Sequence, residues 1–341
     1  MKIAIVILNW NGKQLLEKFM PSIVNFSNIN NVEIYIADNA STDDSIAFVQ
    51  KTFSTVKIVE NKKNGGYAKG YNDALKHIDA DIYGLVNSDI EVTNNWLDTI
   101  ISTFENEPNT AIIQPKILDF KNKELFEYAG AAGGFIDKYG YPFCRGRIFS
   151  NLEKDNNQFN DTSEIFWASG ACFFIKATVF YQLNGFDEDY FAHQEEIDLC
   201  WRAKNLNYSI KYIGASTVYH VGGATLKEES PRKTFLNFRN SLFTLVKNLP
   251  KNQVLEIVFT RLLLDGIAGI KFVLELRIMH TIAILKAHFS FYAQLSKIYK
   301  KRGNHKKKPD YFATKSIVWQ YFILGKKKYS EIDLKNNNYN Q

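Results

Sequence analysis

The sequence predicts an α/β fold built around a mostly parallel sheet, and three observations support this. Short apolar runs rich in β-branched residues alternate with helical periodicity over residues 2–86. Strands linked at this spacing are joined by right-handed crossovers, which lay them parallel in one sheet. The 341 residues exceed the usual size of one domain, about 100–200 residues, so we expect one large domain with an appendage.

Four apolar runs in this region are predicted strands: 2–8, 32–38, 56–60 and 82–86. A helix is predicted over 15–24, where apolar side chains recur every four residues, and Pro21 favours a kink or a later start. Ser41 and Thr42 are candidate N-caps of a second helix. A third helix is predicted over 66–78.

The pattern is less regular from residue 90 to about residue 250. The segments with the clearest periodicity are predicted strands at 111–118, 165–176, 208–213 and 216–220, and predicted helices at 195–206 and 232–248. The stretch 119–163 is polar and rich in Gly, Asn and Asp, so we expect it to form loops.

Short polar side chains follow each of the first four strands. They are Asn9 and Asn11, then Asp38 and Asn39, then Asn61 and Asn64, then Asn87 and Asp89. Ligands bind at the carboxyl ends of the strands in open α/β sheets. A turn preference explains any one of these endings, but four in succession favour a binding crevice.

The positive charge is concentrated near the C-terminus. Lys297–Lys328 holds eleven basic residues and one acid, a local charge of +10, whereas the remainder carries −4 and the whole chain +6. Such a segment can meet anionic lipid or nucleic acid, or can be a solvated tail. Nucleic acid is disfavoured, because stacking aromatics are not interleaved with these charges and the acidic remainder repels phosphate.

Residues 254–286 are dense in Leu, Ile, Val and Phe. Their charges leave no stretch of about 18 uncharged apolar residues, so a membrane span is not expected. On a continuous helix, six of the seven charged residues fall on one half, with Arg277 the exception. Gly266 and Gly269 are the expected break between two amphipathic helices. Packing on the preceding domain and lying on a membrane surface fit this pattern equally well.

Two features favour a cytoplasmic location. Cys144, Cys172 and Cys200 are widely spaced without a CxxC pair, which is typical of a reducing compartment. The N-terminal sequence MKIAIVILNWNG has a short apolar run and no small-residue cleavage site, so it does not read as a signal peptide.

The segment AHQEEIDLCWR (192–202) carries a candidate general base. Glu195 and Glu196 lie at a predicted helix start, where the helix dipole favours acids. Adjacent carboxylates also disfavour double ionisation, which raises one pKa toward a value useful for proton transfer. Asp198 and Arg202 are spaced to pair along the helix.

Two other segments suggest ligand contacts. NGGYAKGYN (64–72) opens a helix, so its N–H groups can face phosphates, although close packing explains its glycines equally well and it is not a P-loop. Asp38 can accept the imide N–H of uracil or thymine. His220, in VYHVGG, follows a strand; a lone His is more often structural, but opposite Asp89 it can complete a hard-cation site with a diphosphate.

These segments together carry a resemblance to a known family. In order and spacing, the sequence resembles a family 2 inverting glycosyltransferase of the GT-A fold, in the rhamnosyltransferase-like branch that builds bacterial surface polysaccharides. The resemblance covers about residues 2–245. The segments that carry it are ILNWNG, IADNASTD, NGGYAKGYN, LVNSD, WASGACFFIK, GFDEDYFAHQEEIDLCWR and VYHVGG.

The resemblance implies roles for individual residues. The nucleotide would be held by Leu8, Asn9, Asn11, Asp38, Asn64, Gly66 and Asn87. The acceptor side would be formed by Trp167, Ser169 and Gly170. Asp89 and His220 would hold a divalent cation, Mg²⁺ or Mn²⁺. Glu196 or Glu195 would be the catalytic base.

Two departures from the family pattern affect this assignment. Asn87 replaces the first acid of the Asp-x-Asp motif, which weakens the expected hold on a metal. Glu196 replaces the usual Asp base, so the choice between Glu195 and Glu196 stays open.

The resemblance also implies a domain plan and partners. Residues 1–110 would bind the nucleotide sugar and 111–250 would face the acceptor within a Rossmann-like GT-A domain, with amphipathic helices and a basic tail over 251–341. The expected reaction moves rhamnose or another hexose from a UDP- or dTDP-linked donor to a glycan or lipid-linked acceptor, at the inner face of the cytoplasmic membrane. The alternative is a catalytically silent nucleotide-sugar-binding or scaffold subunit. A sugar nucleotidyltransferase is disfavoured, because ILNWNG lacks a basic glycine-rich loop.

Overall fold

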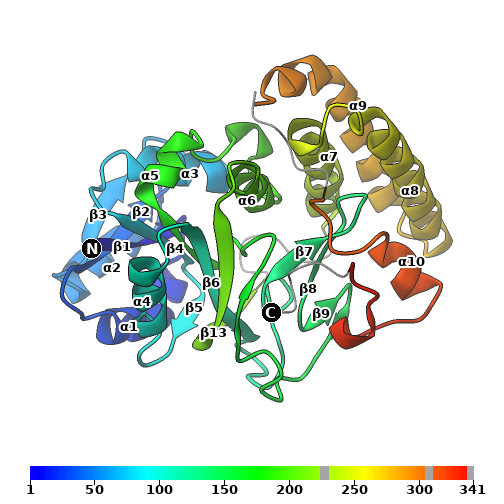
Figure 1. The fold of residues 1–341 in the computed structure, drawn as a ribbon. Coiled ribbons are helices and arrows are strands. Elements are labelled where there is room, and N and C mark those ends of the chain that lie inside the picture. Colours follow the sequence, from blue (N-terminus) through cyan, green and yellow to red (C-terminus); the bar gives the residue numbers. More distant parts are fainter. Residues whose placement is uncertain (223–229, 304–309, 336–341) are drawn as a thin grey trace.

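A nine-stranded sheet lies at the centre of the computed structural model, which describes residues 1–222, 230–303 and 310–335 (Figure 1). The strands run in the order β11-β13-β6-β12-β4-β1-β2-β3, and β5 pairs with β13. A smaller four-stranded sheet has the order β10-β9-β8-β7. The predicted α/β fold is confirmed.

The first half of the main sheet is parallel, as the sequence predicts. Its strands are β1 (Ile3–Asn9), β2 (Val32–Asp38), β3 (Lys57–Glu60) and β4 (Ile82–Asn87). Register places Asn9 beside Asp38, and Leu8 beside Asn87. The carboxyl ends of these strands therefore meet at one edge of the sheet.

Helices cover both faces of this half. Successive strand residues point to opposite faces of the sheet, and both sets of side chains are apolar. The odd-numbered isoleucines of β1 pack with α1 (Lys13–Phe26), and Ala4 and Val6 pack with α3 (Gly66–Leu75). Helix α1 runs through Pro21, so a later start was wrong. Helix α2 (Ser45–Thr52) has Asp44 at its N-cap, so the proposed Ser41 and Thr42 caps were wrong.

The second half of the sheet is mixed rather than parallel. Its elements are β5 (Ile90–Val92), α4 (Asp98–Asn106), β6 (Thr110–Asp119), β12 (Cys172–Lys176), α5 (Ala177–Gln182), the 3₁₀ turn η1 (Glu188–Tyr190), α6 (Glu195–Asn205), β13 (Ser209–His220) and α7 (Pro231–Asn248). β13 is parallel to β6, but β12 runs antiparallel to β4 and β6.

Three predictions in this half need correction. The strand predicted over 165–176 begins only at Cys172. The two short strands predicted from 208 to 220 form one strand, β13, with a register shift between Ile213 and Thr217. The predicted loop 119–163 contains β7 (Gly134–Ile136), β8 (Pro142–Cys144), β9 (Arg147–Ile148), β10 (Asn151–Leu152) and β11 (Thr162–Glu164). These strands are two or three residues long, too short for a periodic signal.

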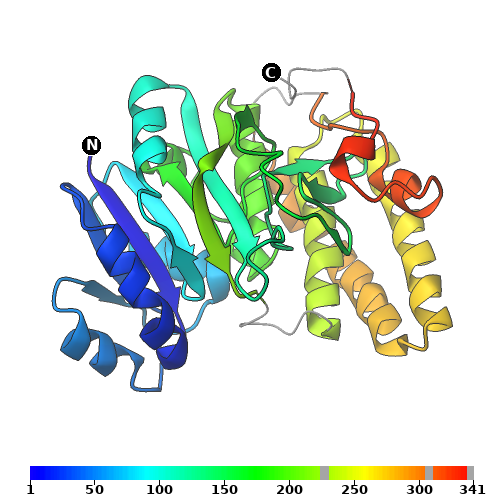
Figure 2. The same cartoon turned by 90° about the horizontal axis from the view of Figure 1, so that it is seen from below.

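Two long helices, a short one and a 3₁₀ turn follow α7. They are α8 (Val254–Leu274), α9 (Ile278–Lys300), α10 (Ile317–Phe322) and η2 (Tyr329–Glu331). Helix α8 runs unbroken through Gly266 and Gly269, so the predicted break was wrong; the chain turns at 275–277 instead, where Leu276 has a φ of 59°. In Figures 1 and 2, α8 and α10 lie on the side of the molecule away from β3.

The C-terminal segment returns to the smaller sheet. Ala313 donates a backbone hydrogen bond to Ile136 in β7, and the Ile317 N–H donates to the Asp137 carboxylate at 3.0 Å. No helix within the described residues is long and apolar enough to cross a bilayer. The division into 1–250 and 251–341 stays a prediction, and part of the basic tail, 304–309, lies outside the described residues.

Candidate active site

The carboxylate of Asp38 organises the ends of β1 and β2. Its oxygens accept hydrogen bonds from the Asn9 amide (3.0 Å), the Ser41 N–H (2.8 Å) and the Ser41 hydroxyl (2.5 Å). Asn9 is wholly buried, whereas Asn11 is exposed and accepts from the Thr42 N–H at 2.7 Å. Asn9 therefore positions Asp38, and Ser41 and Thr42 shape this loop instead of capping a helix.

A second cluster of amides lies at the ends of β2 and β3. Asn39 donates to the Asn64 side chain (3.0 Å) and to the Gly66 carbonyl (3.1 Å), and Asn61 donates to Asn39 (3.2 Å). Gly66 has a φ of 78°, and a Cβ there would lie 2.5 Å from the Phe191 carbonyl. Only glycine fits this approach between α3 and the segment that precedes α6.

The strand pair β5–β13 brings Asp89 and His220 together. Ile90 pairs with His220, and the His220 Nε2 lies 3.2 Å from an Asp89 carboxylate oxygen. Both side chains are buried. Residues 131 positions apart in the chain thus form the contact predicted for a cation site. Asn87 is the last residue of β4, two positions before Asp89, and its backbone N–H donates to the Ala171 carbonyl.

A second acid in this cluster, Glu127, was missed by the sequence analysis. An oxygen of Glu127 lies 3.1 Å from the other ring nitrogen of His220, close enough to pair but not aligned as a hydrogen bond. Glu127 is buried, and it accepts a hydrogen bond from the Ala129 N–H. It lies in the stretch predicted to be loop, where no local signal distinguishes a buried acid from one on the surface.

The two carboxylates control the charge of His220. Burial alone lowers its pKa, but Glu127 and Asp89 outweigh burial and raise the pKa of His220 to about 10. The described residues contain no group of three acidic, His or Cys side chains arranged around one metal position. Asp89 and His220 would nevertheless hold a divalent cation as neighbouring ligands, because the Asp89 oxygen and the His220 Nε2 lie 3.2 Å apart, and the cation would have to displace the Nε2 proton.

Glu195 and Glu196 occupy the first turn of α6, as predicted. Each has a buried carboxylate oxygen that accepts no hydrogen bond among the described residues. Burial, and then the neighbouring Glu196, raise the pKa of Glu195 well above its usual value; burial raises the pKa of Glu196 to about 7. A carboxylate that titrates near neutrality suits general-base chemistry.

Tyr67 links the paired acids to the segment that is predicted to face the acceptor. Its hydroxyl donates to the Gly170 carbonyl at 2.8 Å, and both Glu195 and Glu196 lie close enough to raise its pKa, although burial is the larger cause. Its N–H donates to the Phe191 carbonyl. Tyr67 lies within a quoted motif, NGGYAKGYN, but was not assigned a role there.

The predicted acceptor wall is only partly accessible. Trp167 is buried, and its indole N–H donates to the Phe135 carbonyl at 2.9 Å. Ser169 is buried too, and its N–H donates to the Gln114 side chain. Gly170 alone of these three is partly exposed. Of the predicted acceptor-side residues only Gly170 can therefore meet a ligand directly, and Tyr67, which is partly exposed, lies beside it.

Comparisons with known proteins agree with this architecture. The family model "Glycosyl transferase family 2" matches residues 4–183. The chain belongs to glycosyltransferase family 2. Among its relatives, the N-acetylglucosaminyl-diphospho-decaprenol L-rhamnosyltransferase of Mycobacterium tuberculosis is 22% identical over 232 residues, which are 63% of this chain and 75% of the relative. The chain is thus a transferase with rhamnosyltransferase-like homologues, as its resemblance implied.

Solved structures give the same fold at lower identity. TarS of S. aureus (residues 1–349, in complex with UDP-GlcNAc) has a TM-score of 0.56 and 14% identity, over 88% of this chain and 84% of that chain. The mannosyltransferase PcManGT of Pyrobaculum calidifontis, in complex with GDP-Man and Mn²⁺, has a TM-score of 0.54 and 13% identity, over 85% and 87%. These neighbours confirm the GT-A fold of the transferase.

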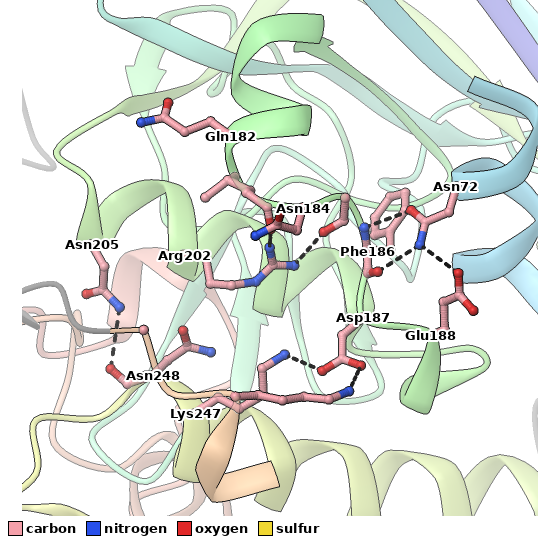
Figure 3. Close-up of a pocket in the computed structure, with 14 residues that line it drawn as sticks. Asn72, Gln182, Asn184, Phe186, Asp187, Glu188, Arg202, Asn205, Lys247 and Asn248 are labelled. Atoms are coloured by element: carbon pink, nitrogen blue, oxygen red, sulfur yellow. Dashed lines mark hydrogen bonds and ion pairs between the residues drawn. The ribbon is translucent and has the colours of Figure 1, made fainter. Parts of the chain in front are cut away.

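A cavity of about 520 Å³ is lined by residues of α6, of α7 and of the segment 182–188 (Figure 3). None of the predicted site residues lines it. Arg202 and Lys247 line it, and both bond the buried Asp198 at 2.8 Å. Burial alone raises the pKa of Asp198, but Lys247 and Arg202 outweigh burial and lower it. This ion-pair cluster joins α6 to α7. It therefore holds in place the helix of the transferase that carries Glu195 and Glu196.

We expect Glu127 to position His220 for a cation. Metal-bound His residues commonly contact a carboxylate through their second nitrogen, and loss of that contact lowers metal affinity about 10–100-fold. Glu127→Gln should therefore weaken Mn²⁺ binding by about that factor, measured by electron paramagnetic resonance of free Mn²⁺ without donor or acceptor. Glu91→Gln, which removes a surface acid from β5, is the matched control. Equal affinities in both variants would rule out this role.

Proposed function

We propose that this transferase inverts the anomeric centre while it moves a hexose from a UDP- or dTDP-linked donor to a glycan or lipid-linked acceptor. The observation that carries the proposal is the Glu195–Glu196 pair, whose buried, unpartnered oxygens lie near Tyr67 and Gly170. A silent nucleotide-sugar-binding subunit would gain nothing from burying two adjacent acids.

In the proposed reaction, Glu196 takes the proton of an acceptor hydroxyl. The acceptor oxygen forms a bond to the anomeric carbon, and the bond from that carbon to the diphosphate oxygen breaks, leaving its electron pair on the diphosphate. Attack opposite the departing group inverts the centre. A divalent cation, when bound by Asp89 and His220, neutralises charge on the leaving diphosphate. Asn87 would hydrogen-bond ribose or a water molecule rather than bind the cation.

Support for the partners comes from the comparisons. The mycobacterial relative is named for a diphospho-decaprenol acceptor and for transfer of rhamnose. TarS was solved with UDP-GlcNAc, and PcManGT with a nucleotide sugar and Mn²⁺. We therefore infer a nucleotide-diphosphate donor, a cation of the Mg²⁺ or Mn²⁺ type, and a lipid-linked acceptor of surface polysaccharide synthesis. Such an acceptor would place the reaction at the inner face of the cytoplasmic membrane.

A donor panel tests the proposal. The full chain is mixed with Mn²⁺ and UDP-, dTDP- or GDP-linked hexoses, and thermal unfolding shows which donor stabilises the fold. The stabilising donor is then assayed for transfer to polyprenyl-diphosphate sugars and for slow hydrolysis. Stabilisation together with turnover supports a transferase, whereas stabilisation without any turnover would favour the silent binding subunit.

The pKa of Glu196 predicts a pH dependence. The base must be ionised to accept a proton, and burial raises the pKa of this carboxyl to about 7. The value of kcat/KM should therefore rise about tenfold per pH unit below neutrality and level off above it. Initial rates measured between about pH 5.5 and 8 check this. A profile that is flat across that interval would show that no group with such a pKa accepts the proton.

A further inference from the structure

Helix α8 buries its Arg261–Asp265 ion pair against the protein and turns large apolar side chains toward solvent, while Glu256 and Lys271 remain exposed. Arg261 and Asp265 are buried and paired at 2.8 Å. Arg261 also donates to the Ser241 hydroxyl of α7 at 2.9 Å, and Asp265 lies 3.3 Å from His288 of α9. The outward residues of α8 are large and apolar: Leu255, Phe259, Leu263, Ile267, Ile270, Val273 and Leu274.

Helix α9 also turns apolar side chains toward solvent. Small and aromatic residues such as Ala283, Ala287 and Phe291 are buried. Its outward residues recur at helical spacing and are again apolar: Ile278, Ile282, Leu285, Phe289 and Tyr292. Helices α8 and α9 pack against each other. We call the outward residues of the two helices the apolar face.

This face is unusual for a protein surface. The exposed fraction is 84% for Leu255, 56% for Leu263 and 74% for Phe289, so these side chains are not half-covered core residues. Single exposed apolar residues are common, but runs along two packed helices mark a surface that meets another apolar phase. Two packed helices that bury the Arg261–Asp265 pair and expose rows of apolar side chains have an outer side suited to such a phase.

Charge at the margin of the apolar face favours anionic lipid over a second copy of this chain. Lys286 and Lys300 are exposed on α9, and Lys300 belongs to the segment Lys297–Lys328, whose sequence carries a charge of +10. On the same side of the molecule, α10 exposes Trp319 and Phe322 and is followed by three consecutive lysines (Figures 1 and 2). A symmetric dimer would bring these like charges together, whereas anionic head groups complement them.

We propose that the apolar face lies in the plane of an anionic bilayer, with α8 and α9 inserted among the acyl chains to the depth of their outward side chains. Partly inserted amphipathic helices bind through apolar burial together with attraction to anionic lipid. Membrane binding by the apolar face is inferred from exposure and charge alone. Only the idea that this binding brings the enzyme to a lipid-linked acceptor rests on the proposed function.

Vesicle flotation of the full chain tests the proposal. The wild-type chain should float with vesicles of equal parts phosphatidylglycerol and phosphatidylcholine, and less with phosphatidylcholine alone. A Leu263→Gln/Phe289→Gln variant should lose roughly tenfold or more of its partition, because two apolar anchors become polar. A Lys286→Gln/Lys300→Gln variant should lose several-fold on anionic vesicles only.

Phe26→Gln/Ile29→Gln is the matched control. It also replaces two exposed apolar residues, but at the end of α1 in the donor-binding half. It should partition as the wild type does. Thermal unfolding and donor binding in solution should be alike in all variants, which shows that changes in partition do not reflect misfolding.

Two outcomes would overturn the proposal. One is unchanged flotation of the Leu263→Gln/Phe289→Gln variant. The other is a wild-type dimer, seen by analytical ultracentrifugation, that this variant splits, because a second copy would then cover the face. Flotation needs neither donor nor acceptor, so a chain that binds vesicles without transferring sugar would contradict the proposed function alone.

Discussion

Replacement of Glu196 by Gln should lower turnover about 10²–10⁴-fold, the usual contribution of a general base. Glutamine keeps the size of the side chain but cannot take a proton from the acceptor hydroxyl. Donor affinity should hardly change, since the proposed base contacts the acceptor. Initial transfer rates at saturating donor, together with donor affinity by calorimetry, measure the two effects separately.

Glu195→Gln is the matched control for this variant. Both acids lie in the first turn of α6 and both have raised pKa values, so a general effect of removing one buried charge would appear in either variant. We expect the larger loss at Glu196, whose pKa of about 7 lies closest to the working range. A larger loss in Glu195→Gln would exchange the two roles, and near-full turnover in both would exclude a base at this helix.

Asp89→Ala should be the most damaging change at the predicted cation site. Asp89 supplies the carboxylate beside His220, and charge neutralisation by a bound divalent cation is worth several kcal/mol, or on the order of 10³-fold in rate. The variant should also bind Mn²⁺ poorly in the absence of donor and acceptor, which electron paramagnetic resonance of free Mn²⁺ measures directly. Chelation with EDTA should stop the wild-type reaction.

Asn87→Ala provides the comparison for Asp89→Ala. Asn87 occupies the first position of the Asp-x-Asp motif, but its neutral amide is a weaker cation ligand than a carboxylate. Its N–H bond to Ala171 comes from the backbone and survives the substitution. We therefore expect a smaller loss of turnover and nearly unchanged Mn²⁺ affinity. A greater loss in Asn87→Ala than in Asp89→Ala would reverse the assignment.

The donor half of the fold was predictable because its signals are local. Each apolar run that becomes β1, β2, β3 or β4 is bounded by polar turn residues, and parallel topology then brings the strand ends together. The polar ends Asp38, Asn39, Asn61 and Asn64 do meet at this edge. The turn propensity of Asn did not reveal that the Asn9 side chain is buried and donates to Asp38. Asn is common in exposed turns and in buried hydrogen-bond networks alike.

The acceptor half was harder to predict because its contacts are distant in the chain. Glu127 and His220 are 93 positions apart. They meet because β13, which ends at His220, pairs with β6, and because the Glu127 N–H donates to the Ile117 carbonyl of β6. The strands of the smaller sheet are too short for a period of two to emerge. Trp167 shows the same limit: the family resemblance assigned it to the acceptor side, but packing against Gly134 buries its ring.

The C-terminal helices separate what sequence determines from what tertiary structure decides. The sequence by itself established that one side of residues 254–286 is charged and the other apolar, because this depends only on the helical period. It left open which side faces the protein, because helical periodicity does not show what a helix packs against. The bonds of Arg261 and Asp265 to Ser241 and His288 decided this. They turn Arg261 and Asp265 inward, and the apolar side of the helix is left facing outward.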